Sequence, residues 1–114
     1  MRSEDREMQD AVKWFKNNYG LKFMKPQERI HHSPNEEKNP KKRMRNAAIG
    51  VESGFPDLVH TWRGEVWFVE MKIEGGRLSE KQKQWRDWAI HYGLNYKLVV
   101  GFEGFKNHVK SLPA

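Results

Sequence analysis

The sequence contains no cysteine among its 114 residues, so a disulfide framework, a thiolate zinc site and a cysteine nucleophile are all excluded. Its longest apolar runs are only a few residues long, far below the ~20 that a membrane-spanning helix needs. Residues 1–7 are rich in charge, with no apolar stretch after these charges, which predicts that they are not a secretory signal. We therefore expect an intracellular protein without a membrane partner.

Hydrophobic residues are also scarce, at 37% of the chain, whereas aromatic residues make up 12%. This balance predicts a small core built from large rings, within one domain that spans residues 1–114. There are 21 Lys and Arg against 15 Asp and Glu, which gives a net charge of +6. An excess of positive charge favours an anionic partner such as nucleic acid, although solubility alone would also account for it.

The apolar spacing predicts an alternation of helices and strands around a mixed sheet. Residues 54–73 form a β-hairpin with its turn at Arg63 and Gly64, and residues 96–100 form a strand parallel to 66–72. A second long helix, from Ser79 to about Tyr92, joins those two parallel strands. The other expected elements are a helix over 4–19, a strand at 29–32, a helical turn at 43–49 and a helix over 102–112. The predicted fold class is α/β, with a central mixed β-sheet flanked by helices in the order α-β-(α)-β-β-α-β-α.

Three tryptophans carry expectations about burial. Trp85 and Trp88 fall at helical spacing on the inner face of the second long helix, together with Gln82, so we expect both in the core. Trp62 lies next to the predicted hairpin turn. We expect it to be exposed, where it would contact DNA or a partner chain.

Glu70 and Lys72 are anomalous because they place two charges on one face of a strand that otherwise reads as core. A buried charge costs several kcal/mol unless it is paired or bound to a metal. One interpretation is an ion pair between these two side chains. The other adds Asp57, on the strand that the hairpin places alongside, and so forms a Mg²⁺ site of hard oxygen ligands.

These residues lie within a longer pattern. Residues 54–57 read Gly-Phe-Pro-Asp and residues 70–72 read Glu-Met-Lys; residues 75–85 follow as Gly-Gly-Arg-Leu-Ser-Glu-Lys-Gln-Lys-Gln-Trp. Together they resemble the VRR-NUC (virus-type replication-repair nuclease) family of the PD-(D/E)xK, restriction-endonuclease-like superfamily. The resemblance is strong over about residues 50–101, and Pro-Asn-Glu at 34–36 resembles a short upstream motif of the family.

The resemblance implies a role for each matching residue. Asp57 and Glu70 would bind the metal, with the backbone carbonyl of Met71 as a further ligand. Lys72 would orient or deprotonate the attacking water. Gln82 would complete the site from the second long helix.

Some positions keep alternative interpretations. Gln82 also fits a capping box that begins at Ser79. The family has a glutamate on its first helix, and either Glu4 or Glu7 fits this position. We favour Glu4, because it lies one turn before Met8 on the core-facing stripe.

A basic stretch begins within the loop predicted over residues 33–42. It is either a solvated segment or, beside a nuclease site, a binding surface for DNA phosphates. Its members are Lys38, Lys41, Lys42, Arg43 and Arg45. His31 and His32 are adjacent in a strand, point in opposite directions and so do not easily share one metal ion.

The resemblance implies a Mg²⁺-dependent endonuclease, with Mn²⁺ as a possible substitute, that cuts branched DNA such as four-way junctions or flaps. Paired cuts at a junction need two active sites, so we expect a homodimer. A bacterial or phage-encoded protein is expected. The alternatives are a catalytically silent DNA-binding module of the same fold, and an unrelated protein with a structural Glu70–Lys72 pair.

Overall fold

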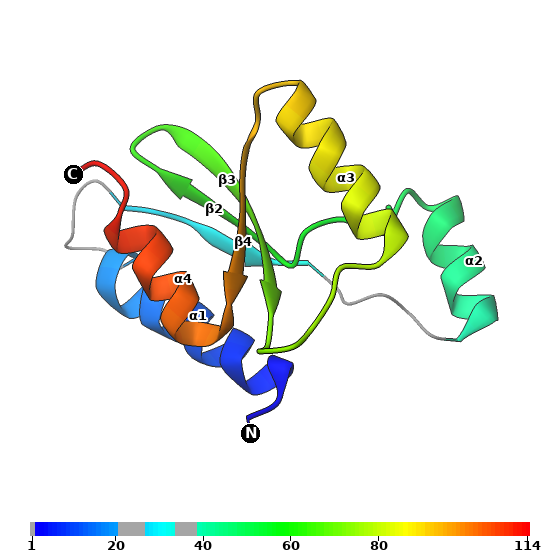
Figure 1. Ribbon diagram of the computed structural model, residues 1–114, viewed down its shortest axis with the longest axis horizontal. Coiled ribbons are helices and arrows are strands. Elements are labelled where there is room, and N and C mark those ends of the chain that lie inside the picture. The colour runs from blue at the N-terminus through cyan, green and yellow to red at the C-terminus, as the bar shows by residue number, and fades with distance from the viewer. Residues whose placement is uncertain (1, 21–26, 34–38) are drawn as a thin grey trace.

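The computed structural model describes residues 2–20, 27–33 and 39–114, and its elements follow the predicted order (Figure 1). The α/β fold, with a mixed sheet flanked by helices, is confirmed. The elements are α1 (Glu4–Tyr19), β1 (Ile30–His32), α2 (Pro40–Ala48), β2 (Leu58–Trp62), β3 (Glu65–Lys72), α3 (Glu80–His91), β4 (Asn95–Val100) and α4 (Gly101–Lys110). No helix among these described residues is long and apolar enough to cross a membrane.

The four strands form one sheet in the order β1-β2-β3-β4. β2 pairs antiparallel with both β1 and β3, whereas β3 pairs in parallel with β4. The antiparallel β2–β3 pair is the predicted hairpin, and its turn places Arg63 at φ 49 and Gly64 at φ 86. The parallel pair requires a crossover, which α3 provides as predicted. β3 therefore lies in the interior of the sheet, where it carries the residues of interest.

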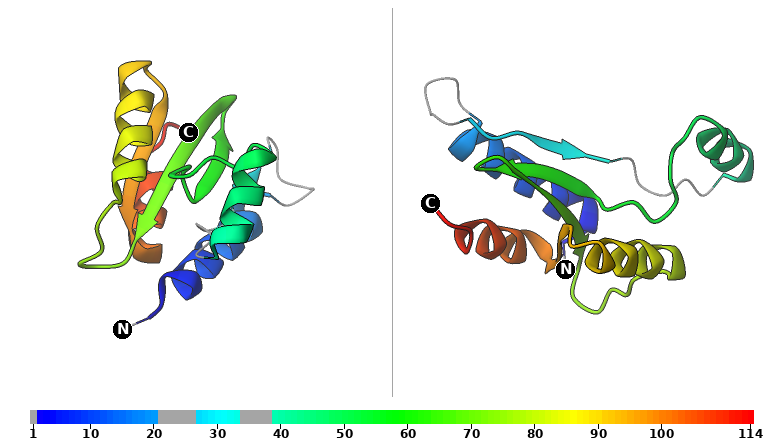
Figure 2. Two further views of the ribbon diagram at one scale, coloured as in Figure 1. Left: turned by 90° about the vertical axis from the view of Figure 1, so that its right-hand side faces the viewer. Right: turned by 90° about the horizontal axis from the view of Figure 1, so that it is seen from above.

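α1 and α4 cover one face of the sheet and pack against each other (Figures 1 and 2). Apolar spacing along α1 turns Met8, Ala11 and Phe15 toward the core, and Ser3 caps the helix by accepting a hydrogen bond from the N–H of Arg6. Phe15 and Phe105 are fully buried against this face. The predicted core of large rings is therefore concentrated between these two helices and the sheet.

α3 covers part of the opposite face through one ring. Trp85 is buried and has its ring centroid 5.1 Å from that of Phe68 and 6.2 Å from that of Tyr96. The expectation that Trp88 is also a core residue is wrong, because its side chain is 51% exposed. α3 contacts β4, the edge strand of the sheet, so little sheet surface remains to cover a second ring one turn further along.

The expectation of an exposed Trp62 is also wrong. Its side chain is only 7% exposed, and its Nε1–H donates a 2.6 Å hydrogen bond to the carbonyl of Pro113. The ring of Tyr19 packs edge-on against it at 5.0 Å, and the guanidinium of Arg63 lies over it at 4.9 Å. Trp62 therefore belongs to the core and is not a contact surface for DNA.

α2 stands apart from the rest of the molecule (Figures 1 and 2). It packs against none of the other described elements and has no buried residue. The helix begins at Pro40, three residues before the predicted turn, because the side chain of Asn39 accepts hydrogen bonds from the N–H groups of Lys41 and Lys42. Proline at the first helical position supports this earlier start.

Candidate active site

Asp57 and Glu70 face each other across the β2–β3 hairpin. The antiparallel register pairs Leu58 with Val69, so the next position outward pairs Asp57 with Glu70. Asp57 is 8% exposed and Glu70 only 1% exposed. Two carboxyl groups therefore meet at one buried point of the sheet, as the sequence predicted from the hairpin.

The surroundings of Glu70 strongly change the pKa of its carboxyl group. Burial raises the pKa of the Glu70 carboxyl to about 10, and a hydrogen bond to the Asp57 side chain together with the charge of Asp57 adds to the rise. The positive charge of Lys72 opposes it. Within the described part of the chain, Oε2 of Glu70 is buried and has no hydrogen-bond partner. The buried Glu70 carboxyl group therefore has one oxygen without a protein hydrogen-bond partner.

The main chain holds Asp57 in place. Its Oδ2 accepts a 2.9 Å hydrogen bond from the N–H of Met71, which lies between Glu70 and Lys72. Its backbone carbonyl accepts a 2.8 Å hydrogen bond from the N–H of Ser33, just after β1. Neighbouring strands on both sides therefore position this carboxylate.

The loop before Asp57 is tied to α3 by a close approach at Gly54. This residue has φ +84, and an added Cβ would lie 2.5 Å from the backbone carbonyl of Lys81. Only glycine fits both the backbone conformation and the space. The contact brings the first turn of α3, which includes Gln82, next to the loop that carries Asp57.

Gln82 has a structural role in this conformation. Its Oε1 accepts a 2.8 Å hydrogen bond from the N–H of Ser79, and its own N–H donates to the Ser79 hydroxyl. This is the capping-box alternative considered from the sequence. The amide NH₂ group of Gln82 is outside that reciprocal pair, so a role in the site stays a prediction.

Lys72 follows Glu70 and Met71 on β3 and is half-buried. No ion pair joins it to Glu70 in the described residues, so the purely structural Glu70–Lys72 pair is not observed. Its charge nevertheless opposes the rise in the pKa of both Glu70 and Glu4. Lys72 is therefore a cation close to the carboxylates but not neutralised by one of them.

The two glutamates of α1, Glu4 and Glu7, have different surroundings in the structure. Burial raises the pKa of Glu4, Lys72 opposes the rise, and Asp57 adds to it, which places Glu4 in the electrostatic environment of the carboxylate pair. Glu7 instead lies at the start of α4, where its Oε1 accepts a 3.3 Å hydrogen bond from the N–H of Phe102 and its Oε2 pairs with Arg2. Glu4 is thus the first-helix acid that lies with the site residues.

Tyr96 was not identified from the sequence. It lies half-buried beside Phe68 in the parallel β3–β4 register, two positions before the pair of Glu70 and Leu98. Burial raises the pKa of Tyr96 to about 12, and the charge of Glu70 contributes to the rise. The signal that finds it is the strand register, because residues 96 and 98 fall on the face of Glu70 once the parallel pairing is assumed.

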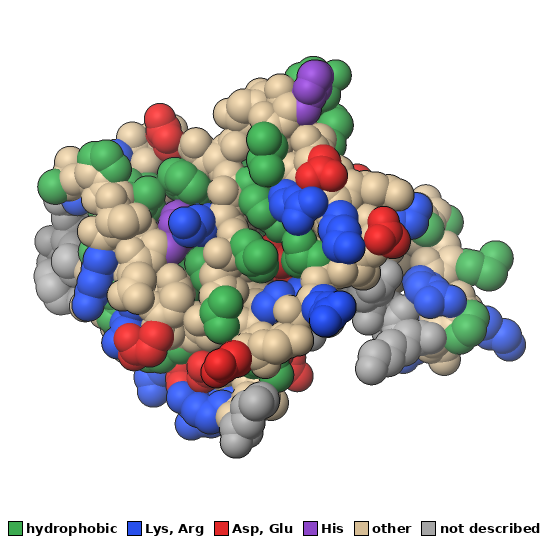
Figure 3. All heavy atoms as spheres, in the orientation of Figure 1, with side chains coloured by type: hydrophobic (Ala, Val, Ile, Leu, Met, Phe, Trp, Pro, Cys, Tyr) green, Lys and Arg blue, Asp and Glu red, His purple; other side chains and the backbone are tan. Residues whose placement is uncertain are grey.

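Four of the five predicted DNA-binding cations lie on α2, away from the carboxylate pair. Lys41, Lys42, Arg43 and Arg45 are all exposed, and Figure 3 shows Lys and Arg side chains on this helix. Lys38 and the motif at 34–36 lie outside the described residues. α2 contains no acidic residue that would offset these charges.

Across residues 2–20, 27–33 and 39–114, no three His, Asp or Glu side chains converge into a set that would hold a metal ion by themselves. The donors that do meet are the two carboxylates of Asp57 and Glu70, beside the backbone of Met71. Mg²⁺ is commonly held by one or two carboxylates, with water and substrate phosphates completing its shell. The buried, unpartnered oxygen of Glu70 and its raised pKa beside Asp57 are compatible with such a cation.

Comparisons with known proteins place this geometry in a family. The family model described as the VRR-NUC domain matches residues 2–101. A solved structure titled "VRR_NUC domain protein" superposes with a TM-score of 0.75 at 19% identity, covering 96% of this chain and 87% of that one. Another, titled "VRR_NUC domain", has a TM-score of 0.66 at 21% identity and covers 96% of this chain and 97% of the other. A search of curated proteins found no match. The chain belongs to the VRR-NUC family, and therefore has a nuclease fold and a DNA-processing function.

Proposed function

We propose that this protein is a metal-dependent endonuclease that hydrolyses phosphodiester bonds in DNA. The observation that carries the proposal is the buried pair of Asp57 and Glu70, with the cation of Lys72 beside it. A fold that needed only stability gains little from two carboxyl groups held together out of water, because their desolvation and mutual repulsion are costly. The same pair is well suited to hold a divalent cation at a DNA phosphate.

Asp57 and Glu70 would hold that cation, Mg²⁺ or Mn²⁺, with the backbone carbonyl of Met71. When bound, the cation supplies positive charge to the scissile phosphate and lowers the pKa of a coordinated water. Asp57 has an oxygen in addition to the Oδ2 that Met71 engages, and Glu70 has its unpartnered Oε2. Each carboxylate therefore retains an oxygen that can serve as a ligand.

The remaining residues act on the water and the phosphate. Lys72, which pairs with neither carboxylate, would orient the attacking water and stabilise the negative charge that develops on the phosphate oxygens. Glu4 would accept a hydrogen bond from water at the edge of the site, consistent with its raised pKa. Gln82 would donate from its amide NH₂ group, because its Oε1 is engaged by Ser79.

Branched DNA, such as a four-way junction or a flap, is the proposed substrate, and a homodimer is the proposed assembly for paired cuts. The cations of α2 would bind the phosphate backbone beyond the cutting site and add a salt-dependent contribution to affinity. A bacterial or phage origin stays a prediction.

The test is a cleavage assay on labelled linear, flap and four-way junction DNA, with Mg²⁺, with Mn²⁺ and with EDTA. Wild type is compared with Asp57→Asn and Glu70→Gln, and with the control Glu103→Gln, which changes an exposed carboxylate on α4. We expect cutting by wild type and the control in either metal, and cutting slower by about 100-fold or more by the two site variants. Cutting by both site variants at the wild-type rate would refute the assigned site. Binding without cutting in any divalent ion would favour the silent DNA-binding module.

A further inference from the structure

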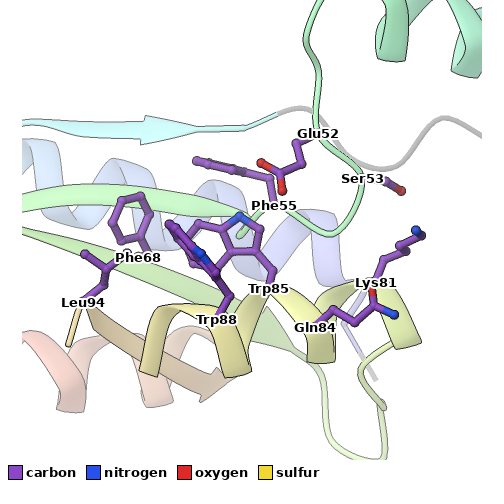
Figure 4. Close-up of a pocket in the computed structure, with 9 residues that line it drawn as sticks. All are labelled: Glu52, Ser53, Phe55, Phe68, Lys81, Gln84, Trp85, Trp88 and Leu94. Atoms are coloured by element: carbon purple, nitrogen blue, oxygen red, sulfur yellow. The ribbon is translucent and has the colours of Figure 1, made fainter. Parts of the chain in front are cut away.

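A cleft of about 620 Å³ opens between the loop at residues 52–55 and α3 (Figure 4). Its size lies within the range of small-ligand pockets, roughly 300–1,000 Å³. Its walls are mainly aromatic and include Phe55, Phe68, Trp85 and Trp88. None of the roles assigned to the site residues uses these rings.

The cleft lies next to the candidate active site, because three of its lining residues are one or two positions from site residues in the sequence. Phe68 precedes Glu70 by two residues on the same face of β3, which is about 7 Å along a strand. Phe55 precedes Asp57 by two residues, and Lys81 of the cleft precedes Gln82. Successive nucleotides in a stacked DNA strand are ~3.4 Å apart. The cleft therefore lies about two nucleotides from the carboxylate pair.

The aromatic rings of the cleft contact one another, and Trp88 is the more exposed of the two tryptophans. Trp85 is fixed by edge-on contacts with Phe55 at 5.3 Å and Trp88 at 5.6 Å. Trp88 is 51% exposed and lies at the mouth of the cleft (Figure 4). The ring of Tyr92 lies 5.7 Å from that of Trp88 at 51°, so the exposed half of the indole is the part to which a flat aromatic ring can stack.

The charges at the rim indicate what kind of ring would enter. Lys81 lies at the end of the cleft nearest the active site and forms no ion pair with any described residue. Figure 3 shows Lys and Arg side chains on α3 together with acidic ones, because Lys83 pairs with Glu80 and Arg86 with Asp87. Glu52 lies at the other side of the mouth, where its carboxylate repels a phosphate but can accept a hydrogen bond from an amino group. This complementarity suits a nucleotide with its base inward and its phosphate at Lys81.

We propose that the aromatic cleft binds one unpaired base of the DNA substrate, stacked on Trp88, about two nucleotides from the cleaved phosphate. A base within a duplex is stacked and paired on both sides, so it reaches such a cleft only after unpairing, which is easiest where the duplex is interrupted. The cleft would thus select DNA with an unpaired nucleotide beside the branch. This inference rests on the proposed function and names the substrate feature that the site reads.

The experiment measures binding in EDTA, so that no DNA is cut. The probes are a flap with 2-aminopurine at the unpaired position beside the junction, the same flap with an abasic residue there, and a fully paired duplex. The variants are Trp88→Ala, Trp88→Phe and the control Ile90→Ala, which removes an exposed side chain of α3 outside the cleft. Because Trp88 is half-exposed, its replacement should leave the fold intact, and a thermal melt checks this.

For wild type we expect quenching of 2-aminopurine and about 5- to 100-fold weaker binding of the abasic flap, which is the range that loss of one base stack produces. Trp88→Ala should lose the quenching and bind both flaps equally weakly, whereas Trp88→Phe and Ile90→Ala should still discriminate. Equal binding of the two flaps by wild type would overturn the proposal. The proposal would also be overturned if Trp88→Ala changed the protein from dimer to monomer and weakened its binding of duplex and flap alike. That result would mean that a second copy of the chain covers the cleft.

Addition of Mg²⁺ separates this proposal from the nuclease activity. Cutting by wild type without discrimination against the abasic flap would refute the cleft and leave the endonuclease intact. Discrimination without cutting in any divalent ion would support the cleft and refute the endonuclease.

Discussion

Oδ2 of Asp57 accepts a 2.9 Å hydrogen bond from the backbone N–H of Met71. This bond ties a loop carboxylate to β3 midway between Glu70 and Lys72, so the protein chain alone brings the carboxylates together. Geometry and charge can therefore be tested separately at Asp57, because asparagine keeps the acceptor oxygen and removes the charge.

We expect Asp57→Asn to fold with nearly unchanged stability and to lose about 100-fold or more of its cleavage rate, the effect of removing one preorganised electrostatic group. Asp57→Ala should in addition be destabilised by about 1–3 kcal/mol, because it leaves the N–H of Met71 without a partner. Urea unfolding and single-turnover cleavage measure the two effects. Full cleavage by Asp57→Asn would contradict the assigned role.

Glu70→Gln should stabilise the protein when EDTA is present. The pKa of Glu70 is raised from its ordinary value near 4.5 to about 10, so the folded state keeps a proton that the unfolded state releases above pH 4.5. Stability associated with this group is therefore complete below pH 4.5 and falls as the pH rises toward 10. Glutamine imitates the protonated form, so its advantage should grow from pH 5 to pH 8, to about 1–3 kcal/mol.

The measurement is the melting temperature of both proteins across that pH range, in EDTA and in Mg²⁺. Mg²⁺ should raise the melting temperature of wild type and leave that of Glu70→Gln nearly unchanged, because ligand binding to the folded state stabilises it. A variant that is less stable than wild type at pH 8 in EDTA would show that Glu70 is favourably ionised and already paired.

Glu4 and Glu7 should give opposite results when each is changed to glutamine. Glu7 accepts a hydrogen bond from the N–H of Phe102 at the start of α4, where the helix dipole also stabilises its negative charge. Glu7→Gln should therefore cost about 1 kcal/mol of stability. Glu4→Gln should leave stability nearly unchanged and slow cleavage. Thermal melts and cleavage rates of the two variants decide this, and the reverse pattern would move the site role to Glu7.

Much of this site was predictable because it depends on local pattern. The two-residue turn at Arg63 and Gly64 sets the register of the hairpin and so places Asp57 opposite Glu70 without any knowledge of the tertiary fold. The assignment between Glu4 and Glu7 was not decided by pattern, because it depends on where the N-terminus of α4 lies. The burial of Trp62 depends similarly on Pro113, which is 51 residues away in the sequence. Trp88 was misjudged because helical spacing does not reveal how much sheet a helix covers.

A buried histidine pair should make the fold sensitive to acid. Nδ1 of His60 lies 2.8 Å from the carbonyl of Thr61 and therefore donates to it, so Nε2 of a neutral His60 accepts from Nε2–H of His108 at 3.0 Å. Burial lowers the pKa of both rings, and that of His108 falls to about 4. The folded state thus excludes protons that the unfolded state binds below pH 6.5.

Stability from His108 is present above pH 6.5 and is lost as the pH falls toward 4, by up to roughly 1.4 kcal/mol per pH unit, and the lowered pKa of His60 acts in the same direction. Glu70 acts in the opposite direction over this range, so the informative quantity is the difference between wild type and His108→Gln. Glutamine can still donate to His60 but does not titrate. We expect His108→Gln to lose less stability than wild type between pH 7 and pH 5 in urea titrations; parallel pH profiles would contradict the assigned hydrogen bond.

The cations of α2 should control the salt dependence of DNA binding without affecting the fold. α2 packs against no other described element, so replacing Lys41, Lys42, Arg43 and Arg45 together with glutamine should leave the melting temperature unchanged. Each lost phosphate contact lowers the slope of log affinity against log salt by about 0.9, so up to four contacts would lower it by about 3 to 4. Lys13→Gln with Lys16→Gln, on an exposed part of α1, is the matched control and should leave the slope unchanged.

A fluorescence anisotropy titration of duplex DNA at several salt concentrations gives both slopes. An unchanged slope in the fourfold variant would mean that α2 carries only solvated charges, and that DNA is held by the cations around α3 instead.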